Sequence, residues 1–355
     1  MSKTTSGVPL SPRSLQDLVQ RHGGAVKNGA SLRSAVVRRL VPVRHAGPGD
    51  LAPLLGARYL EEAIEAQARG AFLLIEGALA ERQDVAALPG WFHPHAAWAL
   101  AELLDAGDAP ADEPVIGDGC RIGRGAVLMP RVRLGARVTI GAGAVIGDTG
   151  FGFAVGPDGA MRPIPHLGGV VIEDDVHIGA LCTVAAGTIS PTLLRKGVKL
   201  DAQVHVGHNC EIGEGTIIAA QSGIAGSVVI GRGVMMGGQV GIADHVTIGA
   251  GARIAAKSGV IGDVAAGTTV AGYPAVERHR WLRGLAELYR LAASRGDSAA
   301  PASNSMRAPG GFSSPPPPVV GSTPPSSRQP SATPPGLRPE AIIRRSEPPT
   351  NGDAT

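Results

Sequence analysis

Aromatic residues are scarce in this 355-residue chain, because Phe, Trp and Tyr together make up only 3% of it. Aromatic rings dominate the cores of many globular domains, so their shortage favours a fold whose interior is narrow and filled by aliphatic side chains. The formal net charge is also small, at +3. A charge so close to zero gives no reason to expect a nucleic-acid partner.

Cysteine is scarce as well, and the three cysteines form no CxxC pair: Cys120, Cys182 and Cys210. This usage argues against a disulfide framework and against the usual zinc spacings, and it favours reduced thiols in a cytosolic protein. The sequence has no apolar run of about 18 residues and no apolar segment near its start that would indicate a secretion signal. We therefore expect neither a membrane span nor export.

Glycine is abundant, with 51 residues, and the chain carries a repeat of period six. Neither the 3.6-residue period of a helix nor the two-residue alternation of a simple strand produces such a pattern. A fixed six-residue period indicates a parallel β-helix, in which each hexad is a short strand plus a turn and three hexads make one triangular coil. The large aliphatic residues that recur are Leu194, Leu200, Val206, Ile212, Ile218, Ile224, Ile230, Met236, Ile242, Ile248, Ile254 and Val260.

The same period begins near Ile116, breaks after Ile146 and resumes at Ile172. We therefore predict a β-helix over residues 114–272, interrupted by an inserted loop at 147–171. Insertions in solenoids tend to gather on one face and to build sites there.

The segments on either side of the repeat differ in composition. Residues 14–106 mix strand and helix patterns and predict a small α/β domain, whose first helix Ser14 would cap. Residues 275–294 have the spacing of an amphipathic helix. We expect disorder at residues 1–13 and in the tail at 296–355, which is rich in proline and serine.

Two histidines stand out on the predicted turns. His208 follows the inward Val206 by two residues, and His245 follows the inward Ile242 by three, so both project outward from one face, two coils apart. A neutral histidine in such a place can act as a general base near pH 7, and Asp201, seven residues earlier, would orient it. On periodicity alone, ordinary surface histidines remain the alternative.

Three separated segments then match one family. They are GPGDLAPLLGARY at 47–59, GFGF through PIPHLG at 150–168, and KLDAQVHVGHN at 199–209. The chain resembles the UDP-3-O-acylglucosamine N-acyltransferases of lipid A biosynthesis. The resemblance implies a homotrimer of left-handed β-helices, each with a small N-terminal α/β domain and a C-terminal helix, and with active sites between neighbouring subunits.

The resemblance also implies roles for individual residues. His208 matches the catalytic base, Asp201 an acidic residue near the sugar amine, and His245 a second histidine that lines the site. Tyr59 matches an aromatic that packs on the uracil. The remaining substrate-binding candidates flank the base or lie in the inserted loop: Asn209, His205, Phe151 and Phe153.

The reaction implied moves a 3-hydroxyacyl chain from the phosphopantetheine thioester of acyl carrier protein to the 2-amine of a UDP-sugar. It needs no metal and no tightly bound cofactor, and it belongs in the cytoplasm of Gram-negative bacteria. Backbone N–H groups of Gly207, Gly223 or Gly226 would stabilise the oxyanion. Basic residues near the C-terminal helix would dock the acidic carrier protein: Arg253, Lys257, Arg278, Arg280 and Arg283.

Three positions depart from the family pattern. Ala185-Ala186 replaces an Asp-Arg pair, Pro53 replaces a second uracil-stacking aromatic, and His205 replaces a glutamine. These changes keep open an acyltransferase that acts on another amino sugar, with acetyl-CoA or an acyl carrier protein as donor. A non-catalytic scaffold whose proline-rich tail recruits partners is a further alternative. A metal-dependent solenoid is weaker, because it needs its three histidines close together.

Overall fold

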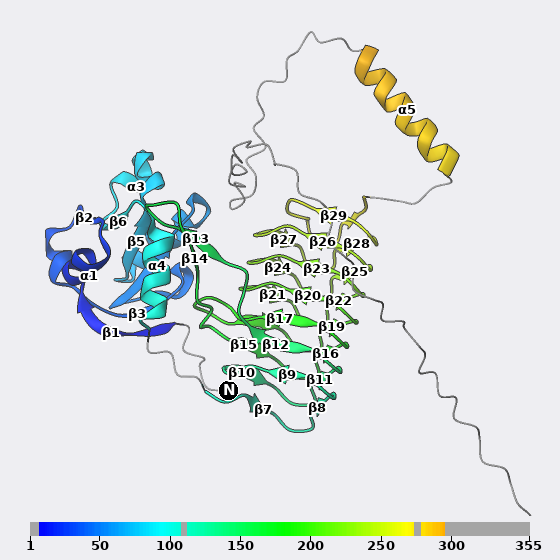
Figure 1. Ribbon diagram of the computed structural model, residues 1–355, viewed down its shortest axis with the longest axis horizontal. Coiled ribbons are helices and arrows are strands. Elements are labelled where there is room, and N and C mark those ends of the chain that lie inside the picture. Colours follow the sequence, from blue (N-terminus) through cyan, green and yellow to red (C-terminus); the bar gives the residue numbers. More distant parts are fainter. Residues whose placement is uncertain (1–6, 108–111, 273–277, 295–355) are drawn as a thin grey trace, which may run out of the picture. The chain divides into compact units, whose positions relative to one another are not determined.

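The computed structural model describes residues 7–107, 112–272 and 278–294. A small α/β domain comes first and a parallel β-helix follows (Figure 1). The β-helix confirms the fold class that the period-six repeat predicts. Residues 1–6, 275–277 and the predicted tail at 296–355 lie outside the described part.

The N-terminal domain is built on a six-stranded sheet with the order β1-β3-β4-β5-β6-β2. The predicted cap is confirmed, because the Ser14 hydroxyl accepts a hydrogen bond from the Asp17 N–H at 3.1 Å and the Asp17 carboxylate accepts one from the Ser14 N–H at 3.3 Å. The elements are β1 Val8–Ser14, α1 Leu15–His22, β2 Ala25–Lys27, η1 Ala30–Ser34, β3 Val36–Leu40, η2 Val43–His45, β4 Asp50–Leu54, η3 Ala57–Tyr59, α2 Leu60–Ala68, β5 Phe72–Glu76, η4 Gly77–Glu81, α3 Gln83–Ala86, β6 Gly90–His93 and α4 Ala96–Asp105.

The prediction of disorder before residue 14 is wrong for strand β1. This strand pairs antiparallel with β3, and Val8 lies opposite Leu40 with only 1% of its surface exposed. Burial of Val8 in the domain core and the hydrogen bonds of the pairing order the segment. Pro9 and Pro12 are tolerated because β1 is an edge strand, on which a missing N–H can face away from the sheet.

The β-helix has three parallel sheets, one on each wall of the prism. Sheet 1 has the order β27-β24-β21-β18-β15-β10-β7, sheet 2 the order β30-β28-β25-β22-β19-β16-β11-β8, and sheet 3 the order β29-β26-β23-β20-β17-β12-β9. The strands are β7 Val115–Ile116, β8 Arg121–Ile122, β9 Val127–Leu128, β10 Val132–Leu134, β11 Thr139–Ile140, β12 Val145–Asp148, β15 Val170–Ile172, β16 His177–Ile178, β17 Thr183–Ala185, β18 Thr192–Leu194, β19 Lys199–Leu200, β20 His205–Val206, β21 Glu211–Ile212, β22 Ile217–Ile218, β23 Gly223–Ile224, β24 Val229–Ile230, β25 Met235–Met236, β26 Gly241–Ile242, β27 Thr247–Ile248, β28 Arg253–Ile254, β29 Gly259–Val260 and β30 Thr269–Val270.

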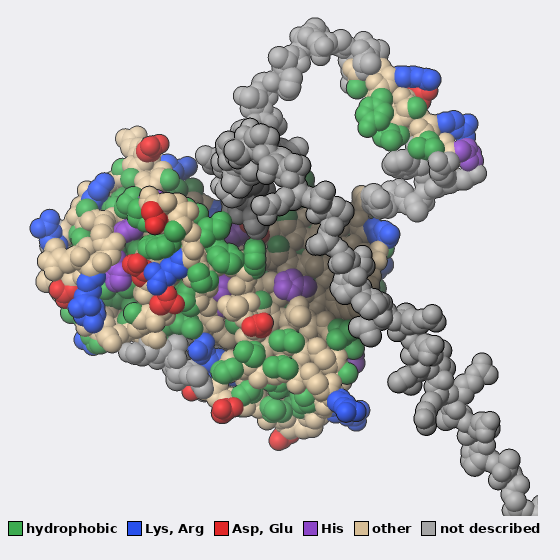
Figure 2. All heavy atoms as spheres, viewed as in Figure 1, with side chains coloured by type: hydrophobic (Ala, Val, Ile, Leu, Met, Phe, Trp, Pro, Cys, Tyr) green, Lys and Arg blue, Asp and Glu red, His purple; other side chains and the backbone are tan. Residues whose placement is uncertain are grey.

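In each two-residue strand of the middle coils, the second residue points inward and is buried, while the first points outward. Ile218, Ile224 and Ile230, on successive walls, are at most 1% exposed. The first coil differs because no coil lies beneath it, so Ile116 and Ile122 are 51% and 41% exposed. Hydrophobic side chains therefore gather at this end of the β-helix in Figure 2.

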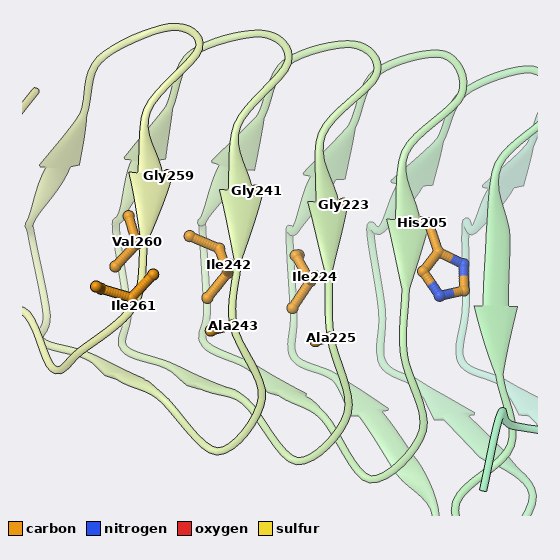
Figure 3. Close-up of a pocket in the computed structure, with 10 residues that line it drawn as sticks. All are labelled: His205, Gly223, Ile224, Ala225, Gly241, Ile242, Ala243, Gly259, Val260 and Ile261. Carbon is orange, nitrogen blue, oxygen red and sulfur yellow. The ribbon is translucent and has the colours of Figure 1, made fainter. Parts of the chain in front are cut away.

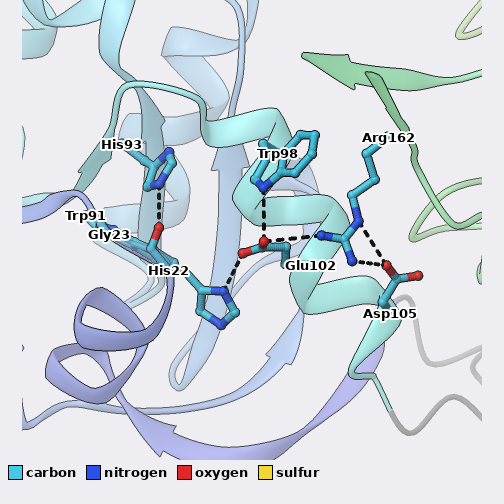
Figure 4. A network of polar contacts seen from close by, with 8 residues as sticks. All are labelled: His22, Gly23, Trp91, His93, Trp98, Glu102, Asp105 and Arg162. Carbon is cyan, nitrogen blue, oxygen red and sulfur yellow. Dashed lines mark hydrogen bonds and ion pairs between the residues drawn. The ribbon is translucent and has the colours of Figure 1, made fainter. Parts of the chain in front are cut away.

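The insertion that leaves the β-helix after β12 and returns at β15 is a β-hairpin rather than an irregular loop. Its strands are β13 Phe153–Val155 and β14 Met161–Pro163, which pair antiparallel. Arg162 of this hairpin is paired with Glu102 and Asp105 of α4. The hairpin therefore links the β-helix to the N-terminal domain (Figure 4).

The predicted C-terminal helix is present as α5, which spans Arg278–Ser294. Within the described residues, none of the helices is both long and apolar enough to cross a bilayer.

The neighbouring residues Thr247 and Ile248 test the packing of the coils. Ile248 is fully buried and Thr247 is exposed. We expect Ile248→Ala to lower the free energy of unfolding by about 2–5 kcal/mol, because it leaves a cavity between stacked coils. Thr247→Ala should change it by less than about 0.5 kcal/mol. Denaturant titration of both variants measures the difference, and equal effects would contradict the assignment of inward and outward positions.

Candidate active site

His208 lies on the turn that follows β20, where Asn209 holds its ring. The Nδ1 atom is 2.8 Å from Oδ1 of Asn209, and that same oxygen accepts a hydrogen bond from the Thr188 hydroxyl at 2.9 Å. The backbone N–H of Asn209 donates to the Thr192 hydroxyl at 2.9 Å. Because an amide oxygen only accepts, the neutral ring carries its proton on Nδ1 and has at Nε2 the lone pair that a general base needs.

The ring of His208 needs the glycine of the next coil beside it. A Cβ atom on Gly226 would lie 2.6 Å from both Cε1 and Nε2 of His208. A side chain at position 226 would therefore displace the ring or cover its free nitrogen. The predicted base thus stands in a slot that the stacked coils shape.

His245 occupies the equivalent corner two coils further on, as predicted. Its Nδ1 is 2.8 Å from the Tyr59 hydroxyl, and the two rings meet edge to face with centroids 6.1 Å apart. Burial, and then the charge of Arg58, lower the pKa of His245, whereas burial raises the pKa of Tyr59. The structure thereby joins two candidates, Tyr59 and His245, that lie 186 positions apart in sequence.

His205 marks one end of a shallow groove on sheet 3. It is the first, outward-facing residue of β20, and its Nδ1 lies 2.7 Å from the Thr183 hydroxyl. Burial of the ring, followed by the nearby His208, lowers its pKa. The next three strands begin with glycine, and the groove over them has a volume of about 530 Å³ (Figure 3).

The glycines of this groove are not required by the backbone. A Cβ atom on Gly223, Gly241 or Gly259 would meet nothing within 4 Å, and none of the three has a left-handed φ. Gly207, on the turn beside His208, is different, because a Cβ there would lie 2.7 Å from the backbone of the next coil. The lack of side chains at these three glycines therefore leaves an open apolar surface. The stacking of the coils does not require glycine at these positions.

Asp201 lies on a different corner from His208, on the turn between sheets 2 and 3. Its side chain is exposed, and Oδ1 accepts a hydrogen bond from the backbone N–H of Ala202 at 2.7 Å. Among the described residues, neither a hydrogen bond nor an ion pair joins Asp201 to His208. The expectation that Asp201 orients the base within one chain is therefore wrong, and Asn209 holds the ring instead.

Phe151 and Phe153 lie together at the start of the insertion. They are 71% and 49% exposed, and their ring centroids are 5.1 Å apart in an edge-to-face arrangement. Their expected contact with the nucleotide or the sugar stays a prediction.

Two of the three expected oxyanion donors are already used. The N–H groups of Gly207 and Gly223 donate to the carbonyls of Ile224 and Val240, both at 2.8 Å, in the ladders between coils. Of the three candidates, Gly226 alone has an N–H without an acceptor among the described residues.

Of the departures from the family pattern, the alanine pair is buried and Pro53 is partly buried. Ala185 and Ala186 are 7% and 2% exposed, so a charged pair would have to be buried here. Pro53 sits in β4 beside Leu74 of β5, beyond the part of β4 that pairs with β3. A missing N–H therefore costs no ladder bond on that side.

The sequence reasoning missed His166. This residue is 7% exposed, and its ring centroid is 4.8 Å from that of His208. It lies in the PIPHLG segment on which the resemblance already rested, but the sequence does not show that this segment returns to the base.

His177, by contrast, is exposed on sheet 2, away from the corner that carries His208 and His245. The metal-dependent alternative needs His177, His208 and His245 close together, and the structure does not bring these three residues together.

The repeat and the coil geometry define the class, which is that of the hexapeptide-repeat β-helix proteins. A family model described as bacterial transferase hexapeptide (six repeats) matches residues 113–148 and 191–226. The UDP-3-O-acylglucosamine N-acyltransferase of Caulobacter sp. (strain K31) is 37% identical over 330 residues, which cover 81% of this chain and 96% of that relative. The chain belongs to the UDP-3-O-acylglucosamine N-acyltransferase family.

Two other comparisons are less extensive. The enzyme of the same name from Caulobacter vibrioides (strain NA1000 / CB15N) is 48% identical over 177 residues, 50% of this chain and 52% of the relative, so the match spans about half of that relative's length. The solved structure of UDP-N-acetylglucosamine acyltransferase from Campylobacter jejuni is 21% identical and covers 54% of this chain and 85% of its own, with a TM-score of 0.39. That score is too low to support any functional statement.

Arg58 provides a test of the electrostatics around His245. Since the positive charge of Arg58 lowers the pKa of His245, we expect Arg58→Gln to raise that pKa toward the ordinary value near 6.5. Titration of the imidazole signals by NMR measures the change. Arg33→Gln, at an exposed arginine in η1, is the control and should leave the pKa of His245 unchanged. A fall in this pKa in Arg58→Gln would contradict the account.

Proposed function

We propose that this protein transfers a 3-hydroxyacyl chain from acyl carrier protein to the 2-amine of UDP-3-O-acylglucosamine, with His208 as the general base. The observation that carries the proposal is the slot around His208, where Asn209 holds Nδ1 at 2.8 Å and the missing side chain of Gly226 leaves Nε2 uncovered. Membership of the family supports the choice of substrate.

The chemistry follows from the tautomer of His208. The sugar amine attacks the thioester carbonyl and forms a C–N bond, while Nε2 of His208 takes the proton that the nitrogen loses. The N–H of Gly226 would stabilise the oxyanion of the tetrahedral intermediate. When that intermediate collapses, the C–S bond breaks and the proton passes to the departing phosphopantetheine sulfur. No metal or tightly bound cofactor takes part in this scheme.

The pair formed by Tyr59 and His245 supports a nucleotide site between the N-terminal domain and the β-helix. Tyr59 is half-buried and would pack on the uracil. Burial raises the pKa of the Tyr59 hydroxyl, and the positive charges of Arg58 and Arg44 oppose that rise. Both arginines are exposed, and they would supply positive charge for a diphosphate. Phe151 and Phe153 would cover the bound sugar or nucleotide.

The groove of Figure 3 suits an acyl chain. The residues that line the groove are apolar apart from His205, which lies at one end of it. His205 is close to His208 in the sequence. We place the hydrocarbon over the three glycines and the thioester at His208. The carrier protein is acidic in general, and exposed basic residues on the last coils and on α5 would dock it: Arg253, Lys257, Arg280 and Arg283.

We further propose that the protein works as a homotrimer in the cytoplasm, with each active site shared between neighbouring subunits. The groove is shallow and open to solvent in a single chain. On sheet 2, the outward residues Ile217 and Met235 are 47% and 48% exposed on adjacent coils, and a second copy would cover them. In a shared site, Asp201 of one subunit would reach the sugar amine held at His208 of another.

An acyltransferase for a different amino sugar is the second candidate. The buried Ala185 and Ala186 favour it, because the family pattern has a charged pair there and the sugar site would differ accordingly.

The activity of His208→Ala tests the proposal. We expect its acyl transfer from hydroxyacyl carrier protein to be about 10²-fold slower or more, since a general base commonly contributes that much. His177→Ala, which removes an exposed histidine from sheet 2, is the matched control and should retain the wild-type rate. Transfer from acetyl-CoA at the same rate would favour the second candidate. Full activity of His208→Ala would contradict the role of His208 as the base, and no acyl transfer by the wild type would favour the scaffold interpretation.

A further inference from the structure

His166 lies on the segment of the insertion that returns to the β-helix, and that segment is fixed on both sides of it. The N–H of Ile164 donates to the Gly152 carbonyl at 2.9 Å. After His166, the N–H of Leu167 donates to the Thr188 carbonyl at 2.9 Å and that of Gly168 to the Gly187 carbonyl at 2.7 Å. Ile164 and Leu167 also pack against the core of the N-terminal domain.

The hairpin that carries this segment is itself clamped to α4. The guanidinium of Arg162 lies 5.5 Å from the Trp98 ring centroid, donates to Glu102 at 3.2 Å, and pairs with Asp105. Glu102 is held in turn by the Trp98 N–H at 2.9 Å and by His22, whose Nδ1 is 2.7 Å away (Figure 4). A network of this kind restricts the hairpin, and with it the position of His166, relative to the domain.

The ring of His166 closes one side of the slot around His208. The two rings are tilted by 56° with centroids 4.8 Å apart. Gly150 lies against both residues, and a Cβ atom there would be 2.6 Å from Nε2 of His166 and 2.7 Å from Cβ of His208. The Thr149 hydroxyl is 3.4 Å from Nδ1 of His166. With Asn209 at Nδ1 and Gly226 on the next coil, His208 is therefore enclosed on several sides.

Burial, reinforced by the charge of His208, lowers the pKa of His166 to about 4. His166 therefore stays uncharged at neutral pH, where a protonated neighbour would oppose the protonation of the base. It is suited to support the base sterically and not to exchange protons itself.

We propose that His166 is a positioning residue, whose buried ring holds the imidazole of His208 in the orientation that presents Nε2 to the substrate. The proposal rests on the proposed function for its effect on turnover. The ring orientation itself is independent of any substrate. In this assignment, His166 comes from the insertion, which is anchored on the N-terminal domain. It acts on His208, which belongs to the β-helix.

The test compares His166→Ala with His166→Gln, in which a planar amide replaces the ring. The ¹⁵N signals of His208 in the free full-length protein report its tautomer. We expect one tautomer, with the proton on Nδ1, in the wild type and in His166→Gln, and a mixture of tautomers in His166→Ala. Arg162→Ala, which releases the hairpin without touching the slot, should give part of the same change. Wild-type signals in both alanine variants would overturn the proposal.

Kinetics provide the second readout. We expect His166→Ala to lower kcat about tenfold or more, because small displacements of a catalytic group are costly, with KM for the UDP-sugar within about twofold of the wild type. His166→Gln should recover most of kcat. A rise in KM alone would mean that His166 contacts substrate and would overturn the positioning role. If the wild type transfers no acyl group at all, the proposed function fails, and the tautomer result still decides the role of His166.

Discussion

The narrow interior of the β-helix is the constraint on which the rest of the structure depends. It admits one aliphatic side chain from each strand, so Val206, Ile224 and Ile242 stack in register along one wall. Because the coils stack this closely, the backbone of the turns has little conformational freedom, and the turn residues are held in fixed positions. Because aliphatic side chains fill the interior, the chemistry depends on the outer faces, on the residues of the turns and on the segments that pack against them.

Two additions to the wall supply that chemistry. The N-terminal domain places Tyr59 against His245, and the insertion brings His166 against His208. Arg162 ties the insertion to the domain, so the two additions are connected to one another. The site is thus assembled on a rigid β-helix by segments that the repeat does not encode.

The period of six was enough to predict the β-helix, the insertion and the outward corners that carry His208 and His245, because inward and outward positions alternate regularly. The contact between Tyr59 and His245 could not be predicted, since a repeat says nothing about how another domain docks. The expected contact of Asp201 with His208 is absent within one chain, because seven residues in sequence lead to a different corner. Strand β1 was missed because two prolines in a short segment resemble a disordered terminus, although an edge strand tolerates them.

The most direct test of the central claim is the product that the wild-type protein forms from hydroxyacyl carrier protein and UDP-3-O-acylglucosamine. We expect a new amide at the sugar 2-amine, which mass spectrometry detects as an increase by the mass of one 3-hydroxy acid less one water. Fragmentation locates the acyl group on nitrogen. Unchanged substrate, or an acyl group found on oxygen instead, would contradict the account.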